Sequence, residues 1–95
     1  MILISLTYVA PMEAVQKHFD GHIEWLNLHY TSGDFIASGR KVPRTGGVII
    51  ARGSPETVRT ICETDPFVSE GVATYELTEV DFSRTIASAE GLKSS

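Results

Sequence analysis

The chain has 95 residues, enough for one domain with a single core, at a size where a second subunit often supplies part of the buried surface. Its net charge of -4 and ordinary apolar content give no field that attracts DNA, RNA or anionic lipid, so we expect neither nucleic acid nor membrane as a partner. The single cysteine, Cys62, excludes an intrachain disulfide and is compatible with a reducing compartment, so we expect a cytoplasmic protein.

The first two predicted elements are a strand and a long helix. Residues 2–9 alternate with a two-residue period and carry apolar side chains on both faces, which is typical of a central strand covered on both sides. A helix of about six turns is predicted over 11–32, because Pro11 suits a first turn and Gly33 the left-handed position after the last. At about 100° per residue, its apolar stripe comprises Val15, Phe19, His22, Leu26 and Tyr30.

His22 stands out because a titratable imidazole lies in the middle of this stripe. Burying an imidazole without a partner costs free energy. The position therefore indicates either a structural hydrogen bond or a pocket in which the ring does chemistry.

The remaining elements follow from turn and cap signals. Residues 35–38 and 48–51 are predicted strands of a hairpin, joined by the Pro-Arg-Thr-Gly-Gly turn stretch at 43–47. A second helix begins after Ser54 and ends near Asp65, since the residue before Pro66 is pushed out of the α region. A fourth strand is predicted over 72–80, and then a C-terminal helix or arm over 82–89. Residues 91–95 look like a loose tail, which leaves 1–90 as a single domain.

This element order, β-α-β-β-α-β, is the ferredoxin-like split arrangement of the α+β class, with two helices on one face of a four-stranded antiparallel sheet. The helices leave the other face of the sheet bare. If apolar residues such as those of the first strand occupy that face, two copies can pack face to face as a dimeric α+β barrel. We therefore expect a homodimer.

Four short motifs follow the order and spacing of a known family. They are Gly-His-Ile-Glu-Trp-Leu at 21–26, Gly-Asp-Phe-Ile-Ala-Ser-Gly at 33–39, Gly-Gly at 46–47 and Asp-Pro-Phe at 65–67. The whole chain resembles the YciI-like family (YCII-related domain), small bacterial proteins of the dimeric α+β barrel class. The resemblance implies a catalytic centre built on a histidine and an aspartate, which map to His22 and Asp65. The family is also similar in fold to muconolactone isomerase, which suggests proton transfer on small organic acids or ring compounds.

His22 and Asp65 each have a functional and a structural interpretation. In the functional one, Asp65 holds one ring nitrogen of His22, fixes the tautomer and leaves the other nitrogen as a base near neutral pH. In the structural one, His22 is a core histidine satisfied by backbone carbonyls or water. Asp65 is then a turn starter whose side chain caps neighbouring backbone N–H groups.

The candidate substrate-binding residues are Ser38, Gly39 and Arg44. A glycine at the end of a strand permits close approach of a ligand to the backbone, although a strand-end bulge explains it equally. Arg40, Lys41 and Arg44 form a cationic loop that could bind a substrate carboxylate or simply be solvated. Arg40 stands where many members of the family carry proline, which puts a flexible cation in place of a rigid ring at the pocket wall.

The other histidines, Cys62 and Trp25 are the remaining candidates for a metal site, a nucleophile or a pocket wall. His18 and His22 have the i, i+4 spacing of a helical metal pair, but His29 lies roughly 10 Å beyond His22, too far to complete one coordination sphere, so we predict no metal and no cofactor. Cys62 is expected to be a small buried hydrophobe, because nothing cationic near it in sequence would lower its pKa. Trp25 either walls a pocket or fills the seam between the helices, and the seam is the simpler expectation.

Two functions are consistent with these residues. The first is a proton-transfer enzyme, an isomerase or lyase acting on a small carbonyl or aromatic compound, with His22 moving the proton and Asp65 orienting the ring. The second is a non-catalytic domain that binds a small ligand or a partner, with His22 as a structural residue. An imidazole within reach of Asp65 and facing a cavity favours the enzyme, and a ring sealed off by side chains favours the container.

Overall fold

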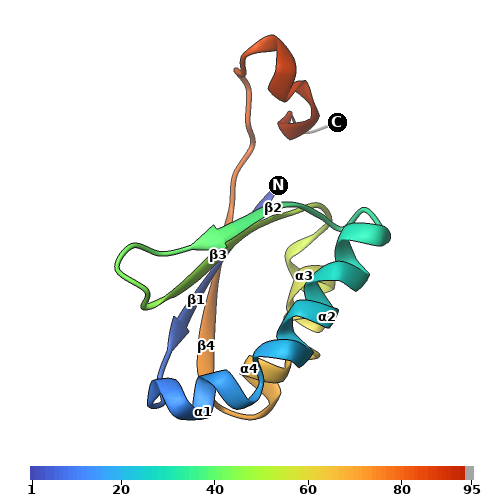
Figure 1. Cartoon of the computed structure of the whole chain (residues 1–95). Helices are drawn as coiled ribbons and strands as arrows, with labels where there is room; N and C mark the ends of the chain where they lie inside the picture. The colour runs from blue at the N-terminus through green and yellow to red at the C-terminus, as the bar shows by residue number, and fades with distance from the viewer. Residues whose placement is uncertain (94–95) are drawn as a thin grey trace.

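Helices cover one face of a four-stranded sheet (Figure 1). The computed structural model describes residues 1–93. The strand order is β2-β3-β1-β4, and every neighbouring pair is antiparallel. The predicted ferredoxin-like α+β fold is confirmed. The elements are β1 (Ile2–Tyr8), α1 (Met12–Lys17), α2 (Phe19–Thr31), β2 (Phe35–Arg40), β3 (Gly46–Ala51), α3 (Pro55–Cys62), α4 (Pro66–Ser69), β4 (Ala73–Glu79) and the 3-10 helix η1 (Ala87–Leu92).

The main core lies between the sheet and the helices. In β1, Ile2, Ile4 and Leu6 face the helices and are at most 2% exposed. Leu3 and Ser5 of the same strand point to the other face and are only half-buried. The central position of β1 is confirmed. The expectation that it is covered on both faces is wrong for the single chain, because α1 to α4 all lie on one side of the sheet and η1 lies at the end of the C-terminal arm (Figure 1).

The predicted helix over 11–32 is divided at His18, whose φ of -108° and ψ of 8° end α1 and begin α2. The two helices lie at an angle to each other (Figure 1). Val15 of α1 packs with Val72 and Ala73 at the start of β4, in a second core cluster at the end of the sheet. A single straight helix is therefore wrong, because α1 has to follow the end of the sheet while α2 packs on its face.

The two glycines expected in the hairpin turn belong instead to β3. Gly46 pairs with Thr7, and Gly47 pairs with Leu6. A Cβ atom at position 46 would overlap the carbonyl oxygen of Leu6, so the close approach of β1 requires glycine there. The strand therefore starts earlier than predicted.

A short helix that was not predicted, α4, follows α3. Ser54 caps α3 by accepting from the backbone N–H of Thr57, and Pro55 takes the first helical position, as expected. The helix ends at Cys62, close to the predicted end. Asp65 then begins α4 as its N-cap, so its backbone is held at the joint between two helices.

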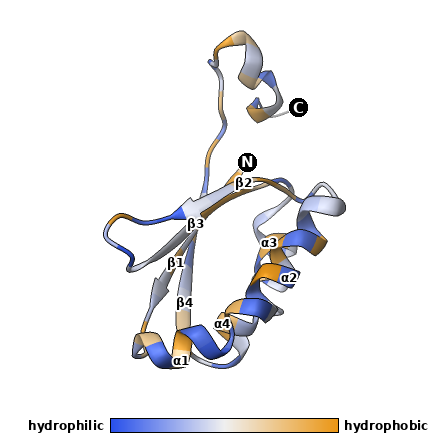
Figure 2. Cartoon of the chain, in the orientation of Figure 1, coloured by the Kyte–Doolittle hydropathy of each residue, from blue (hydrophilic) through white to orange (hydrophobic). Residues whose placement is uncertain are grey.

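Beyond β4 the chain leaves the body of the molecule as an arm, residues 81–93, which is extended at first and ends in η1 (Figure 1). Of the two predicted alternatives the arm is the observed one, and the helix lies later than 82–89 because Ile86 is still extended. Apolar residues occur along the arm (Figure 2), and Ile86 is 72% exposed. Gly91 and Leu92 of the predicted tail belong to η1, and residues 94–95 lie outside the described part.

Candidate functional site

His22 lies on the sheet-facing side of α2 and is joined to a residue far along the chain. Its Nδ1 is 2.9 Å from Oδ1 of Asp65, 43 positions later. A carboxylate accepts hydrogen bonds and cannot donate them, so Nδ1 is the donor and the tautomer is fixed. Within residues 1–93 the other ring nitrogen, Nε2, makes no hydrogen bond, and the His22 side chain remains 11% exposed.

Asp65 is fully buried and makes two kinds of contact, a helix cap and a hydrogen bond to His22. Its Oδ1 accepts the backbone N–H of Phe67 at 3.0 Å, as expected of a capping aspartate, and the same atom accepts from His22. Oδ2 is buried and has no hydrogen-bond partner among the described residues. The cap therefore fixes the carboxylate, and the carboxylate fixes the imidazole.

Aromatic rings hold the plane of the imidazole. The Phe67 ring stacks on His22 with centroids 4.0 Å apart and 10° between the planes, and the Trp25 ring lies at 5.5 Å. Phe67 is 1% exposed, so the stack is in the core. Phe67 had no predicted role. Its membership of the Asp-Pro-Phe motif was the available signal, since one motif supplies both the acid and the stacking ring.

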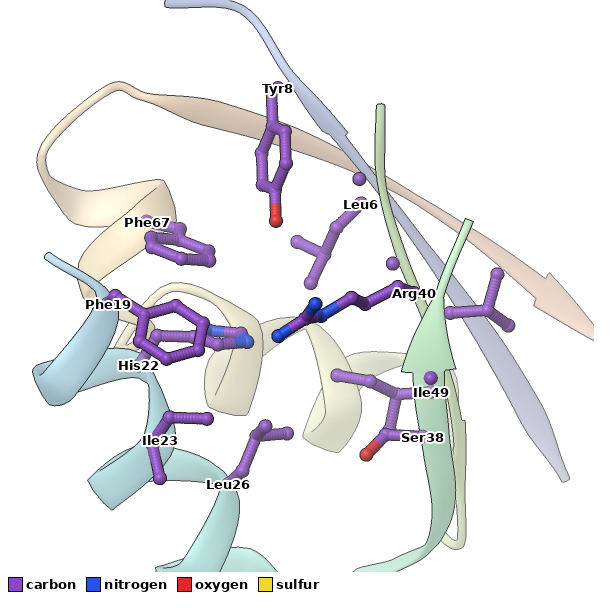
Figure 3. A pocket seen from close by; sticks show the side chains of 14 residues that line it. Leu6, Tyr8, Phe19, His22, Ile23, Leu26, Ser38, Arg40, Ile49 and Phe67 are labelled. Carbon is purple, nitrogen blue, oxygen red and sulfur yellow. The ribbon is translucent and has the colours of Figure 1, made fainter. Parts of the chain in front are cut away.

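A cavity of about 180 Å³ opens in front of His22, between α2 and the strands β1, β2 and β3 (Figure 3). Its walls are mostly apolar, and the polar side chains among its lining residues are Tyr8, His22, Ser38 and Arg40. Apolar walls with a few placed polar groups are typical of small-molecule sites. The volume is below the roughly 300–1,000 Å³ of larger ligand pockets and suits a single small ring.

Two of the three candidate substrate-binding residues line this cavity. Ser38 and Gly39 form part of its wall, and the Ser38 hydroxyl lies 2.6 Å from that of Tyr30. Arg44 does not line it. Its guanidinium lies 5.8 Å from the centre of the Phe19 ring, in a cation-π contact beside the cavity.

Arg40 lines the cavity, the position that was expected of Arg44. The predicted strand ended at Ser38, but β2 continues to Arg40, which pairs with Gly47. A bulge between Phe35 and Ala37 shifts the alternation, so that Ser38 and Arg40 face the helices. Figure 3 shows the Arg40 guanidinium extending from β2 toward His22.

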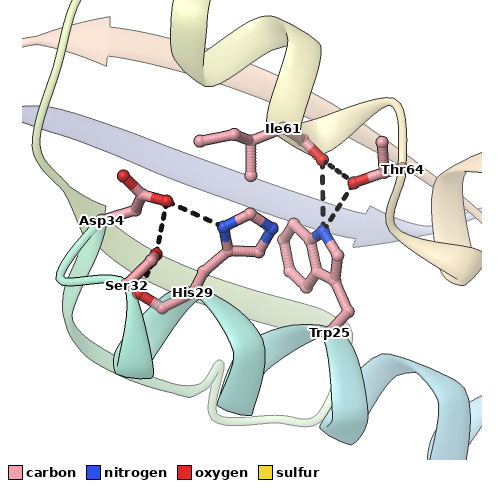
Figure 4. Close-up of polar contacts among 6 residues, drawn as sticks. All are labelled: Trp25, His29, Ser32, Asp34, Ile61 and Thr64. Atoms are coloured by element: carbon pink, nitrogen blue, oxygen red, sulfur yellow. Dashed lines mark hydrogen bonds and ion pairs between the residues drawn. The ribbon is translucent and has the colours of Figure 1, made fainter.

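Trp25 joins α2 to α3 outside the cavity (Figure 4). Its Nε1 donates to the carbonyl oxygen of Ile61 at 3.2 Å and to the hydroxyl of Thr64 at 3.0 Å. The ring is 5% exposed. The expectation that Trp25 fills the seam between the helices is confirmed.

A second histidine and aspartate pair lies near the end of α2 (Figure 4). His29 Nδ1 is 3.0 Å from Oδ2 of Asp34, and the Ser32 hydroxyl donates to the same oxygen at 2.6 Å. These hydrogen bonds lower the pKa of Asp34, that of Ser32 most and that of His29 next. None of these three residues lines the cavity. Their hydrogen bonds join the C-terminal end of α2 to the turn that follows it.

Cys62 is fully buried, as expected. Burial raises the pKa of its thiol to about 12, and the negative charges of Asp65 and Glu63 act in the same direction. A thiol with such a pKa is almost wholly protonated near neutrality. The interpretation of Cys62 as a small hydrophobe is confirmed.

Residues 1–93 contain no group of three His, Cys, Asp or Glu side chains placed to hold a metal ion. In the same part of the chain, no helix combines the length and the apolar character that crossing a bilayer requires.

The sheet, its single layer of helices and the cavity beneath α2 define an α+β protein with the fold of the dimeric α+β barrels. The chain belongs to the YCII-related domain family, whose model matches residues 1–81. The family resemblance inferred from the four motifs is therefore confirmed. No curated protein sequence matches the chain.

One solved structure with this fold is 5-chloro-2-hydroxyhydroquinone dehydrochlorinase from Burkholderia phenoliruptrix AC1100, in complex with 2,5-dihydroxybenzoquinone. The match covers 85% of this chain and 94% of that chain, with a TM-score of 0.70 and 16% sequence identity. At this identity the similarity establishes the fold.

Proposed function

We propose that the protein is an enzyme of isomerase or lyase type that transfers a proton on a small carbonyl or aromatic compound. The observation that carries the proposal is the buried hydrogen bond of 2.9 Å between His22 and Asp65, on an imidazole that lines a cavity sized for one small ring. A base held in one tautomer beside a mostly apolar cavity has the arrangement that proton transfer requires.

His22 acts as the base through Nε2. A C–H or O–H bond of the substrate breaks, the proton moves to Nε2, and the electron pair remains on the substrate, delocalised onto a carbonyl or ring oxygen. In an isomerase the proton returns to another atom. In a lyase a leaving group such as chloride departs with its bonding electrons. Asp65 touches no substrate atom in this scheme: it orients the ring and stabilises the imidazolium.

The structural relative supports the lyase form of this proposal. That protein is a dehydrochlorinase of a chlorinated hydroxyhydroquinone and was crystallised with a dihydroxybenzoquinone. Loss of HCl from such a ring needs a base for a proton and a route out for chloride. A ring of this size suits the volume and apolar walls of the cavity in front of His22.

The test follows two probe reactions in D2O under nitrogen. Chloride release is measured with 5-chloro-2-hydroxyhydroquinone, and deuterium incorporation is measured by NMR with an unsaturated five-membered lactone. We expect turnover of at least one probe, and a loss of about 10²- to 10⁴-fold in His22→Gln. His29→Gln is the matched control, because it makes the same change on the same helix outside the cavity.

Turnover that persists in a folded His22→Gln variant contradicts the assignment. If the wild-type protein is stabilised by these compounds but turns over neither, the non-catalytic ligand-binding domain becomes the better description.

We also infer a homodimer that forms through the sheet face left open by the helices. Leu3 and Ile50 on that face are half-buried and Val48 is 38% exposed, although helices cover the opposite side. Packing two such faces together would bury these apolar side chains. Sedimentation velocity tests this: Ile50→Asp should shift the protein to monomers, and Leu28→Asp, at an exposed apolar position on α2, should not. A monomeric wild type contradicts the inference.

A further inference from the structure

We propose that Arg40 selects the ligand, and that the cavity takes a small cyclic organic anion whose carboxylate or ionised hydroxyl pairs with the guanidinium of Arg40. The inference deepens the proposed function and depends on the cavity being its substrate site. It does not depend on which proton is moved.

The charges around the cavity favour an anion. Among the lining residues Arg40 has the one side chain that is charged at every physiological pH, and no lining residue is acidic. In the described part of the chain none of the three cations of this loop, Arg40, Lys41 and Arg44, makes an ion pair, and Nε of Arg44 is buried without a hydrogen-bond partner. Lys41 donates to the Thr7 hydroxyl at 3.2 Å, and Arg44 lies over the Phe19 ring. Of these three cations Arg40 alone lines the cavity, so it is the one that a ligand in the cavity would meet.

The strand pairing explains why Arg40 points inward. Arg40, Gly47 and Leu6 are cross-strand neighbours, so they share the helix-facing side of the sheet. Gly47 has no side chain, and a Cβ atom there would lie 3.0 Å from the carbonyl oxygen of Gly39. The Arg40 guanidinium extends toward His22 from the opposite wall (Figure 3).

A ligand in the cavity therefore lies between a base and a cation. When His22 takes a proton, the negative charge on the substrate increases, and a guanidinium on the far wall stabilises that charge. The planar fork of arginine also matches a carboxylate or a pair of ring oxygens with two parallel hydrogen bonds. A neutral compound of the same shape would form no ion pair with this guanidinium, which is exposed to water in the free protein.

The experiment measures dissociation constants by calorimetric titration with two matched pairs of probes. Benzoate is compared with benzamide for the carboxylate, and 2,5-dihydroxybenzoquinone with 2,5-dimethoxybenzoquinone for the ionised hydroxyl. We expect the wild type to prefer the anion of at least one pair. Arg40→Gln should bind that anion about 10- to 100-fold more weakly and its neutral counterpart unchanged. Arg40→Lys should lie between, since it keeps the charge and loses the fork.

Arg59→Gln is the control, because Arg59 is exposed on α3 and its loss changes the net charge equally outside the cavity.

The inference is overturned if Arg40→Gln binds the anions as tightly as the wild type, if the neutral compounds bind equally well, or if the wild type binds none of the four. The pair that shows the preference identifies the acidic group. Anion binding through Arg40 without any proton transfer would contradict the proposed function alone. Turnover of neutral compounds without anion binding would contradict this inference alone.

Discussion

Helix α2 carries two histidines that each meet an aspartate, and the two pairs have almost the same length. His22 Nδ1 lies 2.9 Å from Asp65, and His29 Nδ1 lies 3.0 Å from Asp34. The acids differ. The Asp65 side chain is 0% exposed and 43 positions away, whereas that of Asp34 is 37% exposed and 5 positions away.

This difference shows that the hydrogen bond alone does not define a site. The local pair joins the end of α2 to the following turn, where water reaches the acid and Ser32 shares the same oxygen. The long-range pair fixes a ring that lines a cavity, and its acid is held by the cap of another helix. The two pairs differ in the burial of the acid and in the cavity in front of the imidazole.

The largest expected difference is in stability. In Asp65→Ala the N–H of Phe67 and Nδ1 of His22 lose their acceptor in the core, so we expect the free energy of unfolding to fall by about 2–4 kcal/mol. Asp34→Ala removes a partly exposed contact and should cost no more than about 1 kcal/mol. Urea unfolding of both variants measures the difference. Equal losses would mean that burial does not separate the pairs.

The next largest difference between the two pairs is expected in kcat. Asp65→Asn keeps an oxygen that can accept from Phe67 and His22, so it should disturb the fold less than Asp65→Ala. Without the negative charge the imidazolium is less stabilised, and we expect kcat to fall by roughly 10- to 100-fold. Asp34→Asn should leave kcat unchanged. The assay is the chloride release or deuterium incorporation described above, and an unaffected Asp65→Asn would assign Asp65 to capping alone.

A smaller effect is expected at Trp25, whose ring lies 5.5 Å from both histidines. Trp25→Phe keeps an aromatic ring but removes the Nε1 donor to Ile61 and Thr64. We expect a loss of about 1 kcal/mol in the free energy of unfolding, with kcat retained. A large loss of kcat would place Trp25 in the catalytic site and contradict its assignment to the helix seam.

The element order and the family were accessible from the sequence, because alternation, caps and the four motifs are local signals. The apolar stripe of α2 also marked His22. Its contact with Asp65 joins positions 43 apart, and no periodicity reports such a contact, so the family resemblance was needed to pair them. Once the fold is present, the cap of α4 explains why the acid is in place.

Arg40 shows what local patterns miss. Counting alternate residues from buried Phe35 would turn Ala37 and Gly39 toward the helices. The bulge adds one residue to β2 and reverses this, so the inward residues become Ser38 and Arg40. A bulge depends on the partner strand, and the prediction began that strand at residue 48 and not at Gly46, because its glycines were assigned to the turn.

The smallest expected effect concerns the exposed acid and pH. The hydrogen bonds of Ser32 and then His29 hold the pKa of Asp34 below its ordinary value of 3.8. The folded state therefore favours the carboxylate, so its stabilising contribution is complete above about pH 4 and is lost as the pH falls through the depressed pKa. Asp34→Asn should lower the urea midpoint slightly near neutrality, and the difference between the two proteins should shrink as the pH falls through the depressed pKa. A constant difference between the midpoints across this range would mean that Asp34 stabilises the helix end by shape and not by charge.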